Sequence, residues 1–331
     1  MTQRTTARWF EDGQVSVVDV DRVGELLARP DGWLWLDVPV IEEKTELLLL
    51  QQFRIHPRAV MNCMERNHLA RTHVYPEHTL LITHSPEPAE TGHVHYLELD
   101  QIVGERFLIT THGPTNPAVP LATTLRETEQ VAVRVMNGRL RPSGPTALSH
   151  AISTVMVRTQ ELQVAELAKE VGDLERAVMS SQRVDPQGFL EELYSVRHQL
   201  LTVRTLAAQG EQVVGRLLRL SDGAAKPDRE RLKDLIDQYR RVHHVGDSQL
   251  GFLEGVTEHY RARTDTKMAV AAERLAVIAA LTLPVTAISS VLGMNVIVND
   301  STRWGELLIL LALMTAMSLW LLRWARRQGW W

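Results

Sequence analysis

Two uncharged apolar blocks near the carboxyl end of the sequence restrict the possible folds more than any other feature. No formally charged side chain occurs between Leu275 and Val298 or between Leu307 and Leu322. A helix needs about 20 residues to cross the roughly 30 Å hydrocarbon core of a bilayer. The first block has that length, and the second reaches it together with the flanking Trp304, Trp320 and Trp324, which suit the headgroup region. The sequence therefore predicts two membrane-spanning helices.

The charges around the two blocks predict their orientation. Arg323, Arg326 and Arg327 follow the second block, whereas the loop between the blocks holds Arg303 against Asp300. By the positive-inside rule, both chain ends face the cytoplasm and the loop faces outside, as in a multi-pass protein of the cell (inner or plasma) membrane. The alternative is a buried helical hairpin of a soluble protein. Block length, aromatic flanks and terminal arginines favour the membrane.

The composition of the remaining chain indicates a large cytoplasmic part. Charged residues make up 23% of 331 residues, and a formal charge of −4 does not indicate a nucleic-acid partner. Cys63 is the single cysteine, which excludes an intrachain disulfide, and the amino-terminal residues do not resemble a secretory signal. No nucleophile, phosphate loop or catalytic dyad stands out, so the sequence predicts neither an enzyme nor an organic cofactor.

The first 145 residues mix strand and helix patterns, which predicts an α/β sandwich within an α+β cytoplasmic domain. The expected strands are residues 15–20, 33–38, 80–83, 94–103 and 107–111, and the expected helices are residues 41–53 and 118–135.

From Thr146 onward the strand signal disappears and three long helices are expected. The first continues to Gln182, the second covers residues 186–220, and the third restarts at Pro227. No proline follows until Pro284, so the third helix should continue into the first apolar block. The predicted organisation is a cytoplasmic α/β domain (1–145), a helical stalk (146–274), a first span (275–295), an external loop (296–305), a second span (306–324) and a basic cytoplasmic tail (325–331).

The loop opens with Gly293, Met294 and Asn295 at the outer end of the first span, and the segment Leu283-Pro284-Val285-Thr286 precedes it. This arrangement resembles the CorA family of magnesium transporters in the CorA/ZntB superfamily. Weaker similarities extend over most of the chain, namely His56-Pro57 with Glu65, Arg71 and Tyr75, residues 107–111, and the helical series Leu193, Arg197, Leu200, Leu201 and Arg204.

The resemblance implies a funnel-shaped homopentamer whose first span lines the pore and whose second span faces lipid. It also implies uptake of Mg2+, often with Co2+ or Ni2+, driven by the membrane potential. The implied partners are further copies of the chain, the lipid bilayer and divalent cations.

The Gly293-Met294-Asn295 motif is the predicted selectivity filter. Mg2+ gives up its water reluctantly, so a site for the hydrated ion should offer neutral oxygens, and a ring of Asn295 amides would do so. Gly293 would permit a sharp turn at the helix end. The alternative is a glycine cap with asparagine in the turn.

Inward from Asn295, the family's spacing implies a pore face that changes from polar to apolar. Its members are Ser290, Thr286, Leu283, Ala279, Ala276, Leu275, Ala272 and Ala269. Leu283 and Leu275 are the predicted gate, because an apolar constriction can close by dewetting. The sequence departs from the family where alanines replace larger side chains. At the external mouth, Asp300 and Glu306 are the acidic groups that would concentrate cations.

Two further predictions concern metal binding in the cytoplasmic part. Asp234 and Asp237 could bind regulatory Mg2+ between subunits, as the resemblance implies, or form a solvated helix face paired with Arg231, Lys233 and Arg240. Thirteen histidines, including His93 and His95, raise the question of a zinc site, but no cysteine pair or His-x3-His pattern accompanies them.

The sequence leaves two rival functions open. One is Zn2+ transport of the ZntB type, against which Met294 counts. The other is a membrane-anchored helical scaffold that transports nothing, for which polar residues at pore spacing would be unnecessary.

Overall fold

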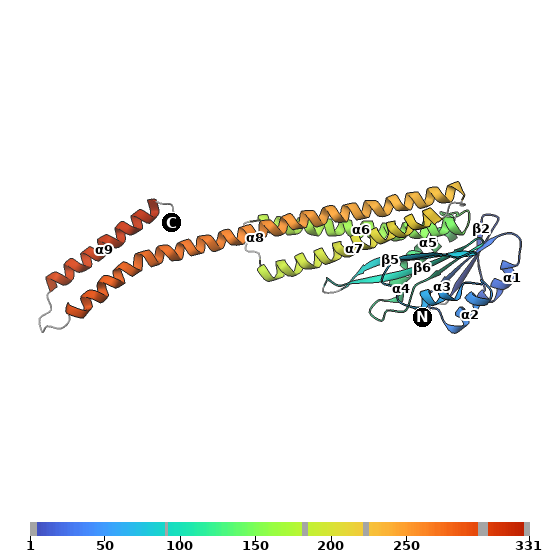
Figure 1. Cartoon of the computed structure of the whole chain (residues 1–331), viewed down its shortest axis with the longest axis horizontal. Helices are drawn as coiled ribbons and strands as arrows, with labels where there is room; N and C mark the ends of the chain where they lie inside the picture. Colours follow the sequence, from blue (N-terminus) through green and yellow to red (C-terminus); the bar gives the residue numbers. More distant parts are fainter. Residues whose placement is uncertain (1–4, 90–91, 181–184, 221–224, 297–303, 328–331) are drawn as a thin grey trace. The chain divides into compact units, whose positions relative to one another are not determined.

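The computed structural model describes residues 5–89, 92–180, 185–220, 225–296 and 304–327 (Figure 1). The chain divides into two compact units, Met1–Glu254 and Gly255–Trp331. The division falls within the long helix α8, Lys226–Val296.

One seven-stranded sheet forms the centre of the first unit among the described residues. Its order is β2-β1-β3-β7-β6-β5-β4, and only the neighbours β3 and β7 run parallel. All five predicted strands are confirmed, and β1 and β4 are additional. The strands are β1 (Thr6–Glu11), β2 (Gln14–Val18), β3 (Trp33–Val38), β4 (Arg71–Val74), β5 (His78–Pro88), β6 (Val94–Gly104) and β7 (Phe107–Thr111).

Helices cover both faces of this sheet. Side chains of a strand alternate between the two faces, and here both faces carry apolar side chains that must be buried. Leu34 and Leu36 belong to one core cluster with residues of α1 (Val23–Leu27), α2 (Glu43–Gln51) and α3 (Pro57–Met64). Trp35, between them, belongs to a second cluster with α5 (Arg126–Met136) and α6 (Pro145–Met179). The first unit also contains the short helices η1 (Val20–Arg22) and α4 (Leu121–Thr124). The predicted α/β sandwich is confirmed.

Three long helices follow the sheet, as the sequence predicted. α6, α7 (Pro186–Leu220) and the first part of α8 lie side by side in Figure 1. In this bundle α8 buries the apolar residues Leu235, Tyr239 and Val242. Gly210 of α7 lets the Tyr239 ring approach, since a Cβ there would lie 2.4 Å from ring atom Cε1. The close packing of α7 against α8 therefore depends on glycine at position 210, opposite the Tyr239 ring.

The second unit contains the carboxyl part of α8 and helix α9 (Trp304–Arg327). α8 has no break between Lys226 and Val296, which confirms the expected continuity. Pro284 lies inside it and has no N–H, so the Ala280 carbonyl lacks its usual helical donor. Judged by length and hydropathy over the described residues, α8 qualifies as a membrane span, whereas the role of α9 as the second span remains a prediction.

Candidate functional site

The two helices of the second unit pack antiparallel. The Ser289 hydroxyl of α8 lies 3.9 Å from the Met314 sulfur of α9. Val277 and Ala325 are the strongly buried residues of the same two helices, at 2% and 5% exposure. In an antiparallel pair, moving 12 residues back from Ser289 corresponds to moving about as many forward from Met314. Both observations therefore fit one register.

One face of α8 is covered by this packing. Burial or partial burial between residues 272 and 290 is confined to Val277, Leu281, Pro284, Val285 and Ile288. At about 100° of rotation per residue, these five positions occupy an arc of about 100°. This arc is the side of α8 that α9 covers.

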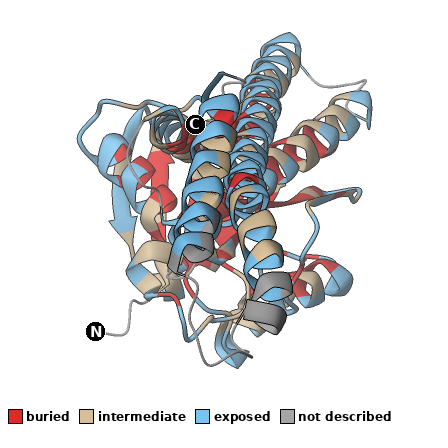
Figure 2. Cartoon of the chain, turned by 90° about the vertical axis from the view of Figure 1, so that its left-hand side faces the viewer, coloured by how far each residue is buried: buried red, intermediate tan, exposed pale blue. Residues whose placement is uncertain are grey.

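The predicted pore residues occupy the opposite side of α8. They lie within an arc of about 120° centred about 170° from the covered face. All of them are exposed within the single chain, and Leu275 and Leu283 are 67% and 66% exposed. Figure 2 colours most of α8 and α9 in the second unit as exposed. The hairpin therefore leaves exposed the face that the family resemblance implies for the pore: Ala269, Ala272, Leu275, Ala276, Ala279, Leu283, Thr286 and Ser290.

The Thr286 hydroxyl on this face has a hydrogen-bond partner within its own helix. The Thr286 hydroxyl donates to the Thr282 carbonyl at 2.8 Å, within its own helix. Its oxygen keeps lone pairs that can accept a hydrogen bond from water. A threonine in this state suits contact with a hydrated cation.

The predicted filter and mouth lie largely outside the described residues. Gly293, Met294 and Asn295 fall in the last turns of α8, but their side chains are not described. Asp300 lies outside the described residues, as does the side chain of Glu306 at the start of α9. The roles of all five remain predictions.

Asp234 and Asp237 are exposed on α8 and have partners within the chain. Asp234 accepts from Gln238 at 2.8 Å and lies 3.2 Å from His150 Nε2, while Asp237 pairs with Arg240 at 3.2 Å. Burial lowers the pKa of His150, although Asp234 opposes this effect. The pairing of Asp237 with Arg240 was expected from the sequence, whereas His150 as the partner of Asp234 was not.

Among the described residues, no group of three or more His, Cys, Asp or Glu side chains is placed to hold a metal ion. His93 and His95 do approach each other, with ring centroids 4.8 Å apart. They form a pair without a third ligand of these types in the described part of the chain.

Sequence reasoning missed a buried charged network on the α5–α6 side of the sheet. Asp37 of β3 accepts from the Thr110 hydroxyl at 2.6 Å and pairs with His112 Nε2 at 3.0 Å. Burial alone would raise the pKa of Asp37, but the bonds from His112 and Thr110 lower it overall. Because β3 and β7 are parallel neighbours, residues about 75 positions apart meet here. No local pattern indicates such a pairing.

A second buried network lies on the other face of the sheet. Glu98 accepts from the Asn67 backbone and side-chain amides at 2.8 and 2.7 Å, and Asp100 accepts from Thr111 at 2.9 Å. Burial raises the pKa of Asp100 well above its ordinary value, and the neighbouring charge of Glu98 adds to this. Burial also raises the pKa of Glu98. Burial therefore favours the protonated form of Asp100 in the folded protein.

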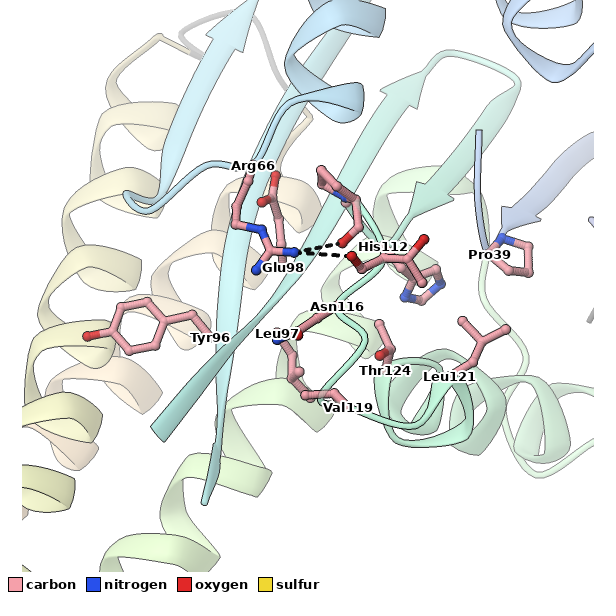
Figure 3. Close-up of a pocket in the computed structure, with 13 residues that line it drawn as sticks. Pro39, Arg66, Tyr96, Leu97, Glu98, His112, Asn116, Val119, Leu121 and Thr124 are labelled. Atoms are coloured by element: carbon pink, nitrogen blue, oxygen red, sulfur yellow. Dashed lines mark hydrogen bonds between the residues drawn. The ribbon is translucent and has the colours of Figure 1, made fainter. Parts of the chain in front are cut away.

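A cavity of about 30 Å³ lies beside these networks, at the carboxyl ends of β3 and β7. Figure 3 shows Glu98, His112 and Asn116 around it, with Arg66 donating to the carbonyls of Pro114 and Thr115 at 3.3 Å each. This volume holds about one water molecule. An organic ligand does not fit there.

Comparisons with known proteins agree over nearly the whole chain. The family described as CorA-like Mg2+ transporter protein matches residues 30–327. A protein of Bacillus subtilis (strain 168), YfjQ, whose name assigns it to metal ion transport, is 22% identical over 313 residues and is matched over 92% of each chain.

Solved structures share the fold. The complete CorA magnesium transporter of Methanocaldococcus jannaschii has a TM-score of 0.81 at 16% identity, with all of both chains covered. Full-length CmaX has a TM-score of 0.76 at 15% identity, over 98% of this chain and 99% of its own. The cytoplasmic domain of ZntB from Vibrio parahaemolyticus has a TM-score of 0.63 at 10% identity, over 80% of this chain and all of its own.

Proposed function

The chain belongs to the CorA-like Mg2+ transporter family, and we propose that it carries Mg2+ across the cell membrane along the free face of α8. The family consists of divalent-cation transporters of the membrane and not of enzymes. The specific ion, the driving force and the pathway are our proposals. The main observation in support of these proposals is that the face of α8 opposite α9 is exposed.

The free face of α8 carries the hydroxyl residues Thr286 and Ser290, which acyl chains cannot hydrate, so contact with lipid alone does not account for it. One hairpin cannot enclose a pore, so several copies must contribute their free faces to a common axis. We propose a homopentamer, in which the α8 helices surround the pathway and the α9 helices lie outside. The pathway then begins at the Asn295 ring, continues past the hydroxyls of Ser290 and Thr286, and narrows at Leu283 and Leu275.

The physical chemistry of Mg2+ supports such a lining. The ion exchanges its water slowly, so neutral amide and hydroxyl oxygens that bind its hydration shell let it pass without a tight carboxylate cage. Uptake driven by the membrane potential follows, because a doubly charged ion gains about 4.6 kcal/mol per 100 mV on moving inward. α9, about 36 Å long by its 24 residues, serves as the second span.

The test is ion flux into vesicles that contain the purified full-length protein, with Mg2+, Co2+, Ni2+ and Zn2+ measured separately. We expect Mg2+ uptake that increases with an inside-negative potential. Asn295→Ala should abolish this uptake while assembly, measured by native mass spectrometry, stays unchanged. Asn299→Ala, which alters the next asparagine along the chain, is the matched control and should transport normally.

Three outcomes would contradict the proposal. Wild-type flux in Asn295→Ala would exclude the amide ring as the filter. A stable monomer or dimer in mild detergents would remove the shared pore. Zn2+ flux without Mg2+ flux would assign the protein to the ZntB type of transport.

A further inference from the structure

Two histidines lie side by side at the start of β6. His95 belongs to this strand, and His93 extends the ladder with β5, since its carbonyl accepts from the Ala89 N–H at 2.8 Å. Successive side chains of a strand point to opposite faces, so His93 and His95 share one face, while Val94 between them lies on the other and is 4% exposed. The backbone itself therefore makes the two imidazoles neighbours.

The separation of the two rings matches that of two imidazoles bound to one metal ion. Their centroids are 4.8 Å apart, at an interplanar angle of 80°. A metal bound to an imidazole nitrogen at about 2.0–2.1 Å lies about 3.2 Å from the ring centre, so two rings that bind it at about 90–109° have centres about 4.5–5.2 Å apart. The observed distance falls within this range, so the pair can hold an ion without a change in the backbone.

The imidazole nitrogens of this pair are available to a ligand. His93 is exposed and His95 is partly exposed. Among the described residues, neither imidazole has a hydrogen-bond or ion-pair partner, and each ring contacts the other. The buried histidines His84 and His112 differ, because the Nε2 atom of each already bonds a protein oxygen.

The carboxylate opposite this pair already has a partner. Glu87 lies directly across from His95 in the β5–β6 ladder, and its Oε2 atom accepts from Arg126 at 3.0 Å. In agreement, no third His, Cys, Asp or Glu of the described residues is placed to bind the same ion. Water would complete the coordination of an ion held by two imidazoles. Such a site is open and exchangeable, unlike a structural zinc site with four protein ligands.

Nitrogen ligands select a different class of ion from the proposed transport pathway. Imidazole suits late first-row divalent ions such as Ni2+, Cu2+ and Zn2+, whereas Mg2+ prefers oxygen ligands. The pathway along α8 offers amide and hydroxyl oxygens. The histidine pair should therefore bind ions that the pathway is not built to select.

We propose that His93 and His95 form a bidentate site for a late first-row divalent ion, with one nitrogen of each ring on the ion and water in the remaining positions. The site lies wholly within the first unit, Met1–Glu254, and does not depend on the transport pathway. It discriminates against Mg2+, because neither protein ligand is an oxygen.

The test is isothermal titration calorimetry of the metal-free, full-length protein, prepared without a histidine tag, with NiCl2, ZnCl2 and MgCl2. We expect His93→Gln and His95→Gln each to weaken Ni2+ and Zn2+ binding about tenfold or more, because a single imidazole cannot chelate the ion. The control is His243→Gln/His244→Gln on α8. The rings of this pair are 5.7 Å apart, outside the chelating range, so the double variant should bind as the wild type does.

Four results would overturn the site. The first three are wild-type Ni2+ and Zn2+ affinity in both single variants, an equal loss of affinity in His243→Gln/His244→Gln, and displacement of Ni2+ by an equal concentration of Mg2+. The fourth comes from thermal unfolding of the metal-free proteins. Both side chains reach solvent, so the single variants should melt at the wild-type temperature. A lower melting temperature in both would assign the lost binding to the fold.

Discussion

Replacing Gly210 by alanine tests the contact between α7 and α8 directly. A Cβ at this position would lie 2.4, 2.6 and 2.7 Å from three atoms of the Tyr239 ring, closer than real Cβ contacts permit. The ring is 1% exposed, so it has no free space into which it could move. One helix or the ring must therefore shift.

The expected magnitude is a difference of two effects. Overpacking a core by one methyl group costs about 1–3 kcal/mol. Alanine in place of glycine within a helix gains up to about 1 kcal/mol. We therefore expect Gly210→Ala to lower the free energy of unfolding by roughly 1–2 kcal/mol.

Gly215 supplies a matched control on the same helix. A Cβ there would meet only the Arg219 guanidinium at 3.7 Å, an ordinary contact distance. Gly215→Ala should therefore raise stability by about 0.5–1 kcal/mol. The two variants carry the same chemical change in one helix, so only the surroundings differ.

The assay is thermal unfolding of the full-length protein in detergent, followed by circular dichroism at one fixed heating rate because membrane-protein unfolding is often irreversible. One kcal/mol corresponds to about 2–4 °C in proteins of 150–250 residues, so the melting temperatures of the two variants should differ by roughly 3–12 °C. Equal melting temperatures, or a more stable Gly210→Ala, would refute the close packing of α7 on Tyr239.

Two further predictions concern buried and exposed carboxylates. Because the pKa of Asp100 is raised in the folded state, its contribution to stability is full below its ordinary pKa of 3.8 and is lost as pH rises through the folded-state value. Asp100→Asn should therefore flatten the fall of melting temperature as pH rises above 3.8. An unchanged slope would contradict a raised pKa of Asp100. If Mg2+ bridges stalk carboxylates between subunits, Mg2+ should protect the cytoplasmic part from protease in the wild type but not in Asp234→Ala/Asp237→Ala. Equal protection of both proteins would place the regulatory site elsewhere, and no protection of either would argue against closure by metal.

Strand prediction succeeded where the sequence alternates or is continuously apolar, and missed β1 and β4. β4 has four residues, Arg71–Val74, with exposed residues at both ends. It becomes a strand because Thr72 pairs with Leu81 of β5. Such a short polar segment has little preference of its own, so its partner decides its conformation.

The candidate pore face was implied by the family resemblance and is consistent with the packing of α8, but the resemblance did not indicate what covers the other side. Which residues face α9 follows from contacts such as that between Ser289 and Met314, which join two helices across a turn. The filter residue Asn295 remains a prediction, because its side chain lies outside the described residues.

The local elements can be recognised from the amino-acid order alone: the apolar blocks, the continuous helix α8 and the strands with clear periodicity. Each depends on neighbours within one or two turns, so its signal lies along the chain. The order of the sheet, the pairing of Asp37 with His112 and the raised pKa of Asp100 arise only when the chain is folded. These depend on the distance and burial of groups far apart in sequence, since the electrostatic cost of a buried charge is set by all of its spatial neighbours together.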